Sequence, residues 1–135
     1  MPNAFLYNME GEKTMLPKGK LTEHFSKKEF DCKCGCETGP INMVLVEKLE
    51  QARVDYARPM RINSGIRCLS HNRSIGSRDT SSHIKCLAAD VSCTSMEARY
   101  KMLSIFLKYF QRVGIHKEFI HVDVDPDKPK GVFVY

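Results

Sequence analysis

Two histidines and an aspartate in the second half of the chain have the residue types of a metal site: His83, Asp90 and His121. Imidazole nitrogens and a carboxylate oxygen are donors that suit Zn²⁺. A site with three protein ligands leaves a fourth coordination position for water, which is the arrangement of a catalytic rather than a structural zinc. These residues therefore predict a hydrolase that depends on a metal ion.

The segments around Asp90 and His121 have the patterns of β-strands. A histidine or an aspartate taken singly usually has a structural role. Residues 87–91, however, are small and apolar apart from Asp90, and an inward carboxylate is costly there unless something such as a metal ion neutralises it. Residues 119–124 alternate, so that His121 and Asp123 share one face and apolar side chains the other. We expect the apolar face to pack and the opposite face to carry the chemistry.

Three motifs together resemble the family of zinc D-Ala-D-Ala carboxypeptidases, which also contains phage endolysin peptidases and the hedgehog signalling domain. The motifs are Ser-x-His-x6-Asp at 81–90, Phe-Ile-His-Val-Asp at 119–123 and Ser-Gly-x-Arg at 64–67. The chain is most similar to the small phage-type and bacterial peptidoglycan peptidases of that family, from residue 21 to the tail at 126–129. The resemblance implies that His83, Asp90 and His121 are the zinc ligands.

The same resemblance gives Arg67 a role in substrate binding. Arg67 is expected to hold a carboxylate of the substrate, because a guanidinium offers a rigid fork of donors that matches a carboxylate. Ser81 lies two residues before His83, where its hydroxyl could orient the imidazole or hold a substrate group. Outside the family context, Arg67 would be taken as a surface cation and Ser81 as a turn residue.

Two carboxylates are candidates for the general base, Glu118 and Asp123. Some family members place an acidic residue three positions before the last histidine, and Glu118 stands there in this chain. Small phage-type relatives often have an uncharged residue at that position, which leaves Asp123 on the same strand face as His121; we favour Glu118. The chain departs from the family pattern at Cys86, where a glycine is common, and at Phe119, where many members carry another histidine.

Two helices are predicted from apolar periodicity and capping residues. The first begins after a cap at Asn42 and ends before Pro59, and the second opens with a capping box formed by Thr94 and Glu97. The side chains expected on their buried faces are Leu45, Leu49, Ala52 and Tyr56 in the first helix, and Met96, Tyr100, Leu103, Leu107 and Phe110 in the second.

The remaining segments complete an α+β fold. Residues 60–63 predict a strand, residues 68–82 a long surface loop, and residues 132–135 a strand that could pair with the strand around His121. Helices packed on a small, mostly antiparallel sheet that carries the zinc site make a single small domain. We place a loosely ordered lead-in at 1–20 and the zinc metallopeptidase domain at 21–135.

Length and charge limit the class of protein. The 135 residues, of which 42% are hydrophobic, suffice for one domain with a core. The formal charge of +5 would help approach to an anionic polymer such as a bacterial wall, and the absence of Trp and of interleaved aromatic residues disfavours a nucleic-acid surface. The sequence predicts neither a signal peptide nor a membrane span, and we expect a monomer made in the cytoplasm that reaches the wall by another route, such as phage lysis.

The cysteines of the sequence leave several alternatives open. Cys32, Cys34 and Cys36 are closely spaced, and with Cys68 they could form a second zinc site, one or two disulfides, or a set of free thiols. The spacing differs from the Cys-x-x-Cys of common zinc knuckles. Cys86 and Cys93 flank Asp90 and are expected to fill the core.

The function that fits these observations is a zinc-dependent peptidase that hydrolyses a bond in the stem peptide or cross-link of peptidoglycan. A D,D-carboxypeptidase and an endolysin-like endopeptidase both remain open, because D-Ala-D-Ala, L-Ala-D-Glu and cross-bridge bonds are not distinguished by these motifs. The alternative is a zinc-stabilised binding module of the same fold without turnover, as the hedgehog domain illustrates.

Overall fold

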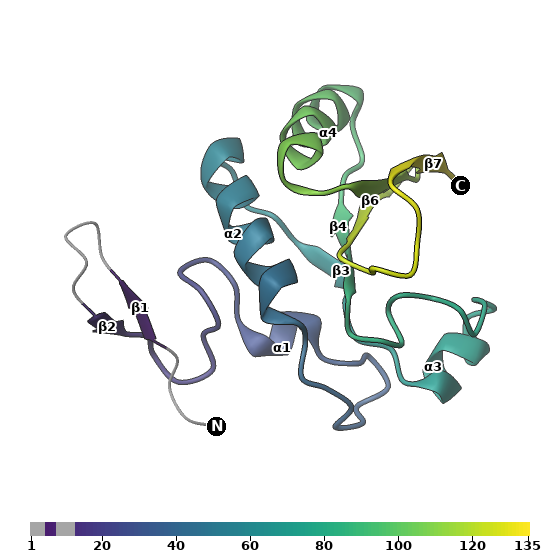
Figure 1. The fold of residues 1–135 in the computed structure, drawn as a ribbon, viewed down its shortest axis with the longest axis horizontal. Helices are drawn as coiled ribbons and strands as arrows, with labels where there is room; N and C mark the ends of the chain where they lie inside the picture. Colours follow the sequence, from purple (N-terminus) through teal and green to yellow (C-terminus); the bar gives the residue numbers. More distant parts are fainter. Residues whose placement is uncertain (1–4, 8–12) are drawn as a thin grey trace.

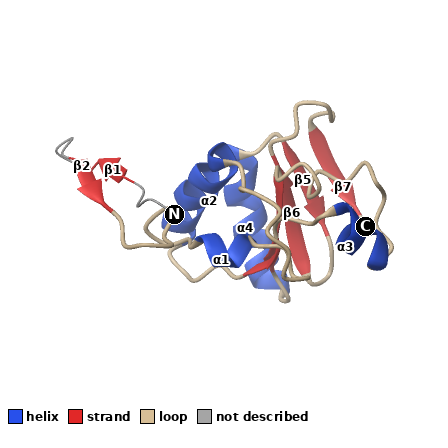
Figure 2. Cartoon of the chain, turned by 90° about the horizontal axis from the view of Figure 1, so that it is seen from below, coloured by secondary structure: helices blue, strands red, loops and turns tan. Residues whose placement is uncertain are grey.

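A five-stranded sheet lies at the centre of the fold, with helices α2 (Met43–Tyr56) and α4 (Met96–Tyr109) on one of its faces (Figures 1 and 2). This computed structural model describes residues 5–7 and 13–135. The strands of the sheet are β3 (Ile62–Ser64), β4 (Ala88–Ser92), β5 (Arg112–Ile115), β6 (Phe119–Asp123) and β7 (Gly131–Val134). The predicted class, an α+β fold with a mostly antiparallel sheet, is confirmed. Among the described residues, no helix has the length and apolar character needed to cross a membrane.

The order of the strands is β3-β4-β6-β5-β7, and all neighbours are antiparallel except β5 and β7. We expected the C-terminal strand to pair with the strand around His121, and this prediction is wrong, because β5 lies between them. Strand β5 has only four residues and includes Gly114, so its sequence carries little strand signal. The C-terminal strand therefore reaches the sheet edge beside β5 and runs parallel to it.

The two faces of β4 and β6 differ in character, as the alternation predicted. The apolar side chains that face α2 and α4 are fully buried: Ala89, Val91, Ile120 and Val122. On the opposite face, Asp90 stands directly across from His121 in the antiparallel ladder. The core thus lies between the sheet and the two helices, and the other face is left for polar side chains.

Helix α2 has the cap and the buried face that the sequence predicts. The Asn42 carboxamide oxygen accepts hydrogen bonds from the backbone N–H groups of Val44 and Leu45, at 2.9 and 3.2 Å. The helix ends where Ala57 adopts a left-handed conformation with φ of 58°, two residues before Pro59. The four side chains predicted for the buried face, Leu45, Leu49, Ala52 and Tyr56, are all buried.

The buried face of helix α4 matches the predicted one only in part, since Phe110 is buried and Leu103 packs partly against the core, whereas the other three predicted side chains are exposed. The cap is Ser95 rather than Thr94, since the Ser95 hydroxyl oxygen accepts a hydrogen bond from the Ala98 N–H at 3.1 Å. Met96 and Tyr100 are 84% and 80% exposed, and Leu107 is exposed as well. The residues of this helix that are buried are Met102, Ile105 and Phe106. The second half of this helix carries apolar residues on all sides, so its periodicity does not define one apolar face. Contacts with α2 and the sheet decide which face is buried.

The segment 68–82, predicted as a long loop, contains the short helix α3 (Leu69–Ser74). The loop prediction is wrong for these residues because tertiary hydrogen bonds outweigh their low helix propensity. Asn72 is fully buried; its side-chain nitrogen donates to the Arg78 carbonyl at 2.8 Å, and its side-chain oxygen accepts from Arg67 at 3.2 Å.

The expected loosely ordered lead-in at 1–20 lies partly outside the described residues. Within it, β1 (Phe5–Tyr7) and β2 (Lys13–Met15) pair in antiparallel fashion. Farther along, Lys20 forms an isolated bridge with Ser26, which caps the short helix α1 (Lys27–Phe30).

Glu50 on α2 ties this helix to the segment before α1. The backbone N–H of His24 donates to one Glu50 oxygen at 2.7 Å, and His24 Nδ1 lies 2.5 Å from the other. Burial alone would raise the pKa of Glu50, but the hydrogen bonds from His24 outweigh it and lower this pKa. A carboxyl group with a lowered pKa stabilises the fold above its unfolded-state pKa, and this contribution is lost as the pH falls through the folded-state value.

We therefore expect Glu50→Gln to reduce the free energy of unfolding by about 1 kcal/mol at neutral pH. The difference from the unsubstituted protein should shrink as the pH falls below about 4. Urea denaturation followed by circular dichroism at several pH values measures it. Glu47→Gln, at an exposed position on the same helix, is the matched control. A destabilisation independent of pH would show that the charge of Glu50 does not contribute.

Candidate metal centre

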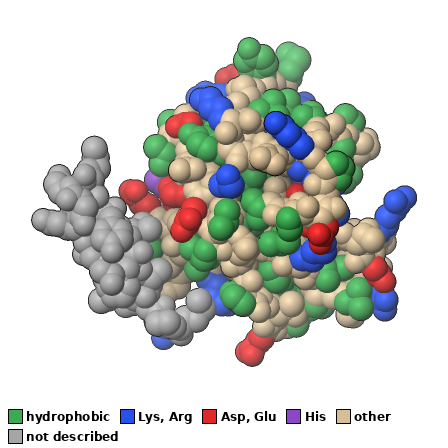
Figure 3. Space-filling model, viewed as in Figure 1, with side chains coloured by type: hydrophobic (Ala, Val, Ile, Leu, Met, Phe, Trp, Pro, Cys, Tyr) green, Lys and Arg blue, Asp and Glu red, His purple; other side chains and the backbone are tan. Residues whose placement is uncertain are grey.

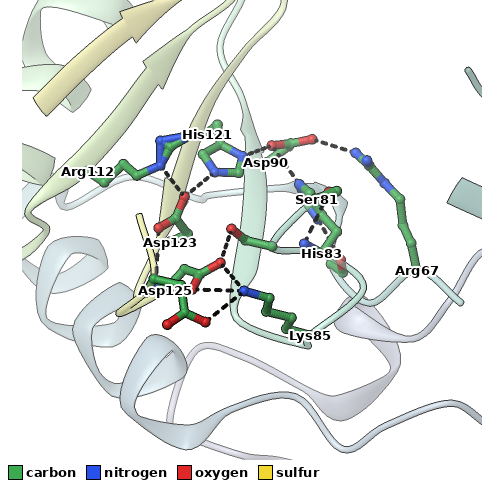
Figure 4. A network of polar contacts seen from close by, with 12 residues as sticks. Arg67, Ser81, His83, Lys85, Asp90, Arg112, His121, Asp123 and Asp125 are labelled. Atoms are coloured by element: carbon green, nitrogen blue, oxygen red, sulfur yellow. Dashed lines mark hydrogen bonds and ion pairs between the residues drawn. The ribbon is translucent and has the colours of Figure 1, made fainter. Parts of the chain in front are cut away.

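Three donor groups converge on the polar face of the sheet. Asp90 on β4 and His121 on β6 are cross-strand partners, and His83 reaches them from the turn that precedes β4 (Figure 4). Asp90 Oδ1 lies 3.2 Å from His83 Nε2 and 3.0 Å from His121 Nδ1. One donor atom of each residue lies within 4.8 Å of the other two, and all three residues are buried. The structure thus brings together the three residues predicted as metal ligands.

In both histidines, the ring nitrogen that faces away from Asp90 already has a hydrogen-bond partner. His83 Nδ1 lies 2.6 Å from the carbonyl oxygen of Gly65, and His121 Nε2 lies 2.6 Å from Asp123 Oδ2. An oxygen acceptor at one ring nitrogen favours the proton there, which leaves the other nitrogen with a free lone pair. The nitrogens left free are the two that face Asp90. This donor set, with its outer hydrogen bonds, fits a zinc ion held by His83, Asp90 and His121.

Electrostatics within the cluster favour a charged carboxylate. Without a metal ion, the same two nitrogens can instead carry protons and donate them to Asp90. Burial alone would raise the pKa of Asp90, but these hydrogen bonds from His121 and His83 lower it well below its usual range. His121 responds in the opposite direction: burial would lower its pKa, and the carboxylates of Asp123 and Asp90 raise it. Protons and a metal ion would therefore compete for the same nitrogen of His121.

Arg67 lies against the second oxygen of Asp90. Its Nη2 donates to Asp90 Oδ2 at 3.1 Å, Nε donates to the Ser64 hydroxyl at 2.9 Å, and Nη1 donates to Asn72. A guanidinium has five N–H donors, so two of them remain for another acceptor. Arg67 therefore orients Asp90. It also lines the open cleft that lies over the three candidate ligands, and it presents its remaining donors to that cleft.

Asp123 is held on several sides. Besides its contact with His121, its Oδ2 lies 3.2 Å from Nε of Arg112, and its Oδ1 accepts from the backbone N–H of Asp125 at 3.2 Å. Arg112 in turn lies over the ring of Phe133, 4.3 Å from its centroid. Asp123 is therefore placed to orient the imidazole of His121.

The other predicted site residues lie at the margin of the cluster. Glu118 is exposed in the turn before β6 and is not among the residues that line the metal cleft. Ser81 lines that cleft, and its hydroxyl oxygen accepts from the backbone N–H of His83 at 3.3 Å. The structure thus brings Ser81 close to His83 and leaves Glu118 free of the cluster.

An open cleft of about 820 Å³ lies over the three candidate ligands. Its wall includes four cationic side chains, Arg67, Arg78, Arg112 and Lys128. Aromatic side chains from the C-terminal half also line it, namely Phe119, Phe133 and Tyr135. The Phe133 ring lies over Gly114, where an added Cβ would meet it at 2.3 Å, and its centroid is 5.4 Å from that of His121. The cleft can therefore accept a substrate with apolar groups and negative charges.

Two polar contacts that the sequence did not reveal fix the turn carrying His83. Lys85 and Ser82 from this turn both bind the buried carboxylate of Asp125, with Lys85 Nζ at 3.1 Å and the Ser82 hydroxyl at 2.7 Å from Oδ2 (Figure 4). Arg112 was missed as well. No sequence motif marks these residues, because Asp125 binds residues about forty positions earlier in the chain and Arg112 contacts a residue eleven positions later.

An α+β domain with two histidines and an aspartate beneath an open cleft has the layout of a metal-dependent hydrolase. The family model described as Peptidase M15 matches residues 23–123, which is more than half of the chain, and the chain therefore belongs to that family. The predicted membership of the zinc D-Ala-D-Ala carboxypeptidase-type family is confirmed, and with it a peptidase class. No curated protein matches the chain significantly.

Proposed function

We propose that this protein is a zinc-dependent peptidase that cleaves a peptide bond in the stem peptide or cross-link of peptidoglycan. The observation that carries the proposal is the donor geometry: each histidine points one nitrogen at Asp90 and has its other nitrogen held by Gly65 or Asp123. Membership of Peptidase M15 supports peptide bonds as the target.

Different residues of the chain would have different roles in hydrolysis. Zinc bound by His83, Asp90 and His121 would polarise the scissile carbonyl and lower the pKa of a bound water to about 7. A carboxylate must then accept the proton of the water and return it to the leaving amine. Asp123 has both oxygens in contact with His121, Arg112 and Asp125, and we therefore assign the proton transfer to Glu118. This assignment requires the exposed Glu118 side chain, which does not line the cleft, to turn into it when the substrate binds.

The charge of the cleft supports a substrate that carries carboxylates, as wall peptides do. Lys and Arg side chains are spread over the face seen in Figure 3, whereas four cations gather along the metal cleft. Arg67 has two donors to spare beside Asp90, and a carboxylate is the acceptor that a guanidinium binds best. We assign Arg67 to a substrate carboxylate and Ser81 to support of His83 or to a substrate group.

Digestion of purified sacculi tests the proposal. The zinc-loaded protein should release new amino and carboxyl ends from stem peptides or cross-links, and mass spectrometry of the products identifies the bond. A chelator should stop the release and added zinc should restore it. Sacculi that bind the protein and yield no new ends would instead favour a binding module without turnover.

A second prediction concerns Arg67. Arg67→Lys should lower kcat/KM for wall peptides with the free carboxylate by roughly 10- to 100-fold, because lysine replaces a bidentate donor with a point charge. Bound zinc should be unchanged, since a cation remains beside Asp90. Kinetics on synthetic peptides and metal analysis measure both quantities. Arg78→Lys, at an exposed position on the same cleft, is the control and should have little effect.

The same experiment should be repeated with the substrate carboxylate amidated. The loss caused by Arg67→Lys should then shrink sharply, because the partner of Arg67 has already been removed and the two changes are not independent. If the substitution and the amidation are fully additive, Arg67 does not bind that carboxylate.

A further inference from the structure

A second group of potential metal ligands lies away from the zinc cleft. The sulfur atoms of Cys32, Cys34, Cys36 and Cys68 all lie within 4.8 Å of one another. Cys32 Sγ is 3.4 Å from Cys34 Sγ, which is 3.6 Å from Cys68 Sγ. None of these residues lines the cleft over His83, Asp90 and His121. The fold thus brings together four thiols from two distant parts of the chain, which is the number of ligands in a structural zinc site.

The local backbone directs these sulfur atoms to one place. The Gly35 N–H donates to the Cys32 carbonyl at 3.1 Å, which closes a tight turn, and Gly35 has a φ of +85°, where glycine is favoured. This turn allows three cysteines separated by single residues to present their sulfurs to a common point. Cys68, which caps α3, supplies the fourth from the other side.

The distances fit a shared metal ion better than disulfides. A disulfide requires the two sulfur atoms to approach to about 2.05 Å. Four thiolates around one zinc ion, with Zn–S of about 2.3 Å, stand about 3.8 Å apart in a tetrahedron. Separations of 3.4 and 3.6 Å lie close to the tetrahedral value.

Backbone donors also point at two of the sulfurs. The Cys68 N–H donates to Cys32 Sγ at 3.4 Å, and the His71 N–H donates to Cys68 Sγ at 3.4 Å. Hydrogen bonds of this kind stabilise sulfur that carries negative charge, which is the state of a cysteine bound to a metal. We propose that Cys32, Cys34, Cys36 and Cys68 bind a second zinc ion in a closed, structural site with four thiolate ligands.

Such an ion would cross-link the segment after α1 to the segment that carries Arg67. These two segments already touch, because the Ile66 N–H donates to the Phe30 carbonyl at 2.8 Å. They are closely packed as well, since a Cβ on Gly65 would lie 2.7 Å from that same carbonyl oxygen. Gly65 and Arg67 are the residues that hold His83 and Asp90. The second ion would therefore stabilise the segment that positions His83 and Asp90, without taking part in the reaction at the first site.

Metal analysis of the full chain tests this proposal. The purified protein should contain two zinc ions, and His121→Ala should retain one, held by the cysteines. Replacement of that remaining ion by cobalt(II) should give the intense sulfur-to-cobalt charge-transfer absorption of a tetrathiolate site. Under denaturing conditions without reductant, all the cysteines of the sequence should react as free thiols once the metal is removed.

Single substitutions separate this site from the first. Cys34→Ser, at an exposed position, should release one zinc and lower the midpoint of thermal unfolding while His83, Asp90 and His121 keep theirs. Cys93→Ala, at a buried cysteine outside the cluster, is the control and should keep both ions. The proposal is overturned if the wild-type protein has fewer free thiols and a mass reduced by the hydrogens lost in a disulfide. It is equally overturned if all thiols are free and no second ion or tetrathiolate spectrum is found.

Discussion

Replacing His121 with alanine is expected to release the catalytic zinc ion and to abolish peptide hydrolysis. His121 supplies one of only three protein ligands, and its imidazole lies between the carboxylates of Asp90 and Asp123. Removal of the ring leaves a vacant position and two buried carboxylates without their shared partner. The loss of kcat/KM on wall peptides should therefore exceed the roughly 10- to 100-fold that loss of an outer hydrogen-bond partner costs. Elemental analysis measures the zinc.

The same result is expected for His83→Ala and Asp90→Ala, because each supplies one of the three donors that the described residues bring together at this site. His71→Ala is the matched control, since His71 on α3 lies outside the three candidate ligands and its replacement should keep the zinc and the activity. If all three alanine variants keep their full zinc content at this site, the ligand assignment is wrong.

The second large effect is expected when the two carboxylates are replaced, and the two variants should lose activity for different reasons. Glu118→Gln keeps the size of the side chain but cannot accept a proton, so kcat should fall by about 10²-fold or more with zinc and fold retained. Asp123→Asn should weaken zinc binding by roughly 10- to 100-fold, because Asp123 orients His121. Zinc titration of each variant, followed by kinetics at saturating zinc, separates the two roles.

Excess zinc should restore most of the activity of Asp123→Asn and none of that of Glu118→Gln. The opposite pattern, with Glu118→Gln nearly fully active and Asp123→Asn inactive at saturating zinc, would assign proton transfer to Asp123. If both variants are active at saturating zinc, neither carboxylate is the base.

The candidate ligands could be chosen from the sequence because two local signals coincide there. Asp90 interrupts a run of small apolar residues, and His121 stands on the polar side of an alternating segment. Alternation depends only on the pleat of a strand, so it predicts the face of a side chain without knowledge of its neighbours. The cap at Asn42 and the buried face of α2 were predictable for the same reason, since neighbours along one helix decide both.

Elements with ambiguous local signals were misjudged. Apolar side chains surround the second half of α4, so its buried face depends on where α2 and the sheet lie. The partner of β7 depends on the insertion of β5, whose four residues include a glycine and carry little pattern. Helix α3 forms around the buried hydrogen bonds of Asn72 to residues outside the helix.

The sequence by itself indicated the family through the resemblance of its motifs, the α+β class through periodicity, and the side chains able to hold a metal ion through their residue types. Only the tertiary structure decided how those side chains are oriented. It turned one nitrogen of His83 to Gly65, set Arg67 against Asp90 and brought Cys68 to the cysteines at 32–36. Hydrogen bonds and sulfur contacts act over a few ångströms between residues far apart in the chain, so their partners are known only once the chain has folded.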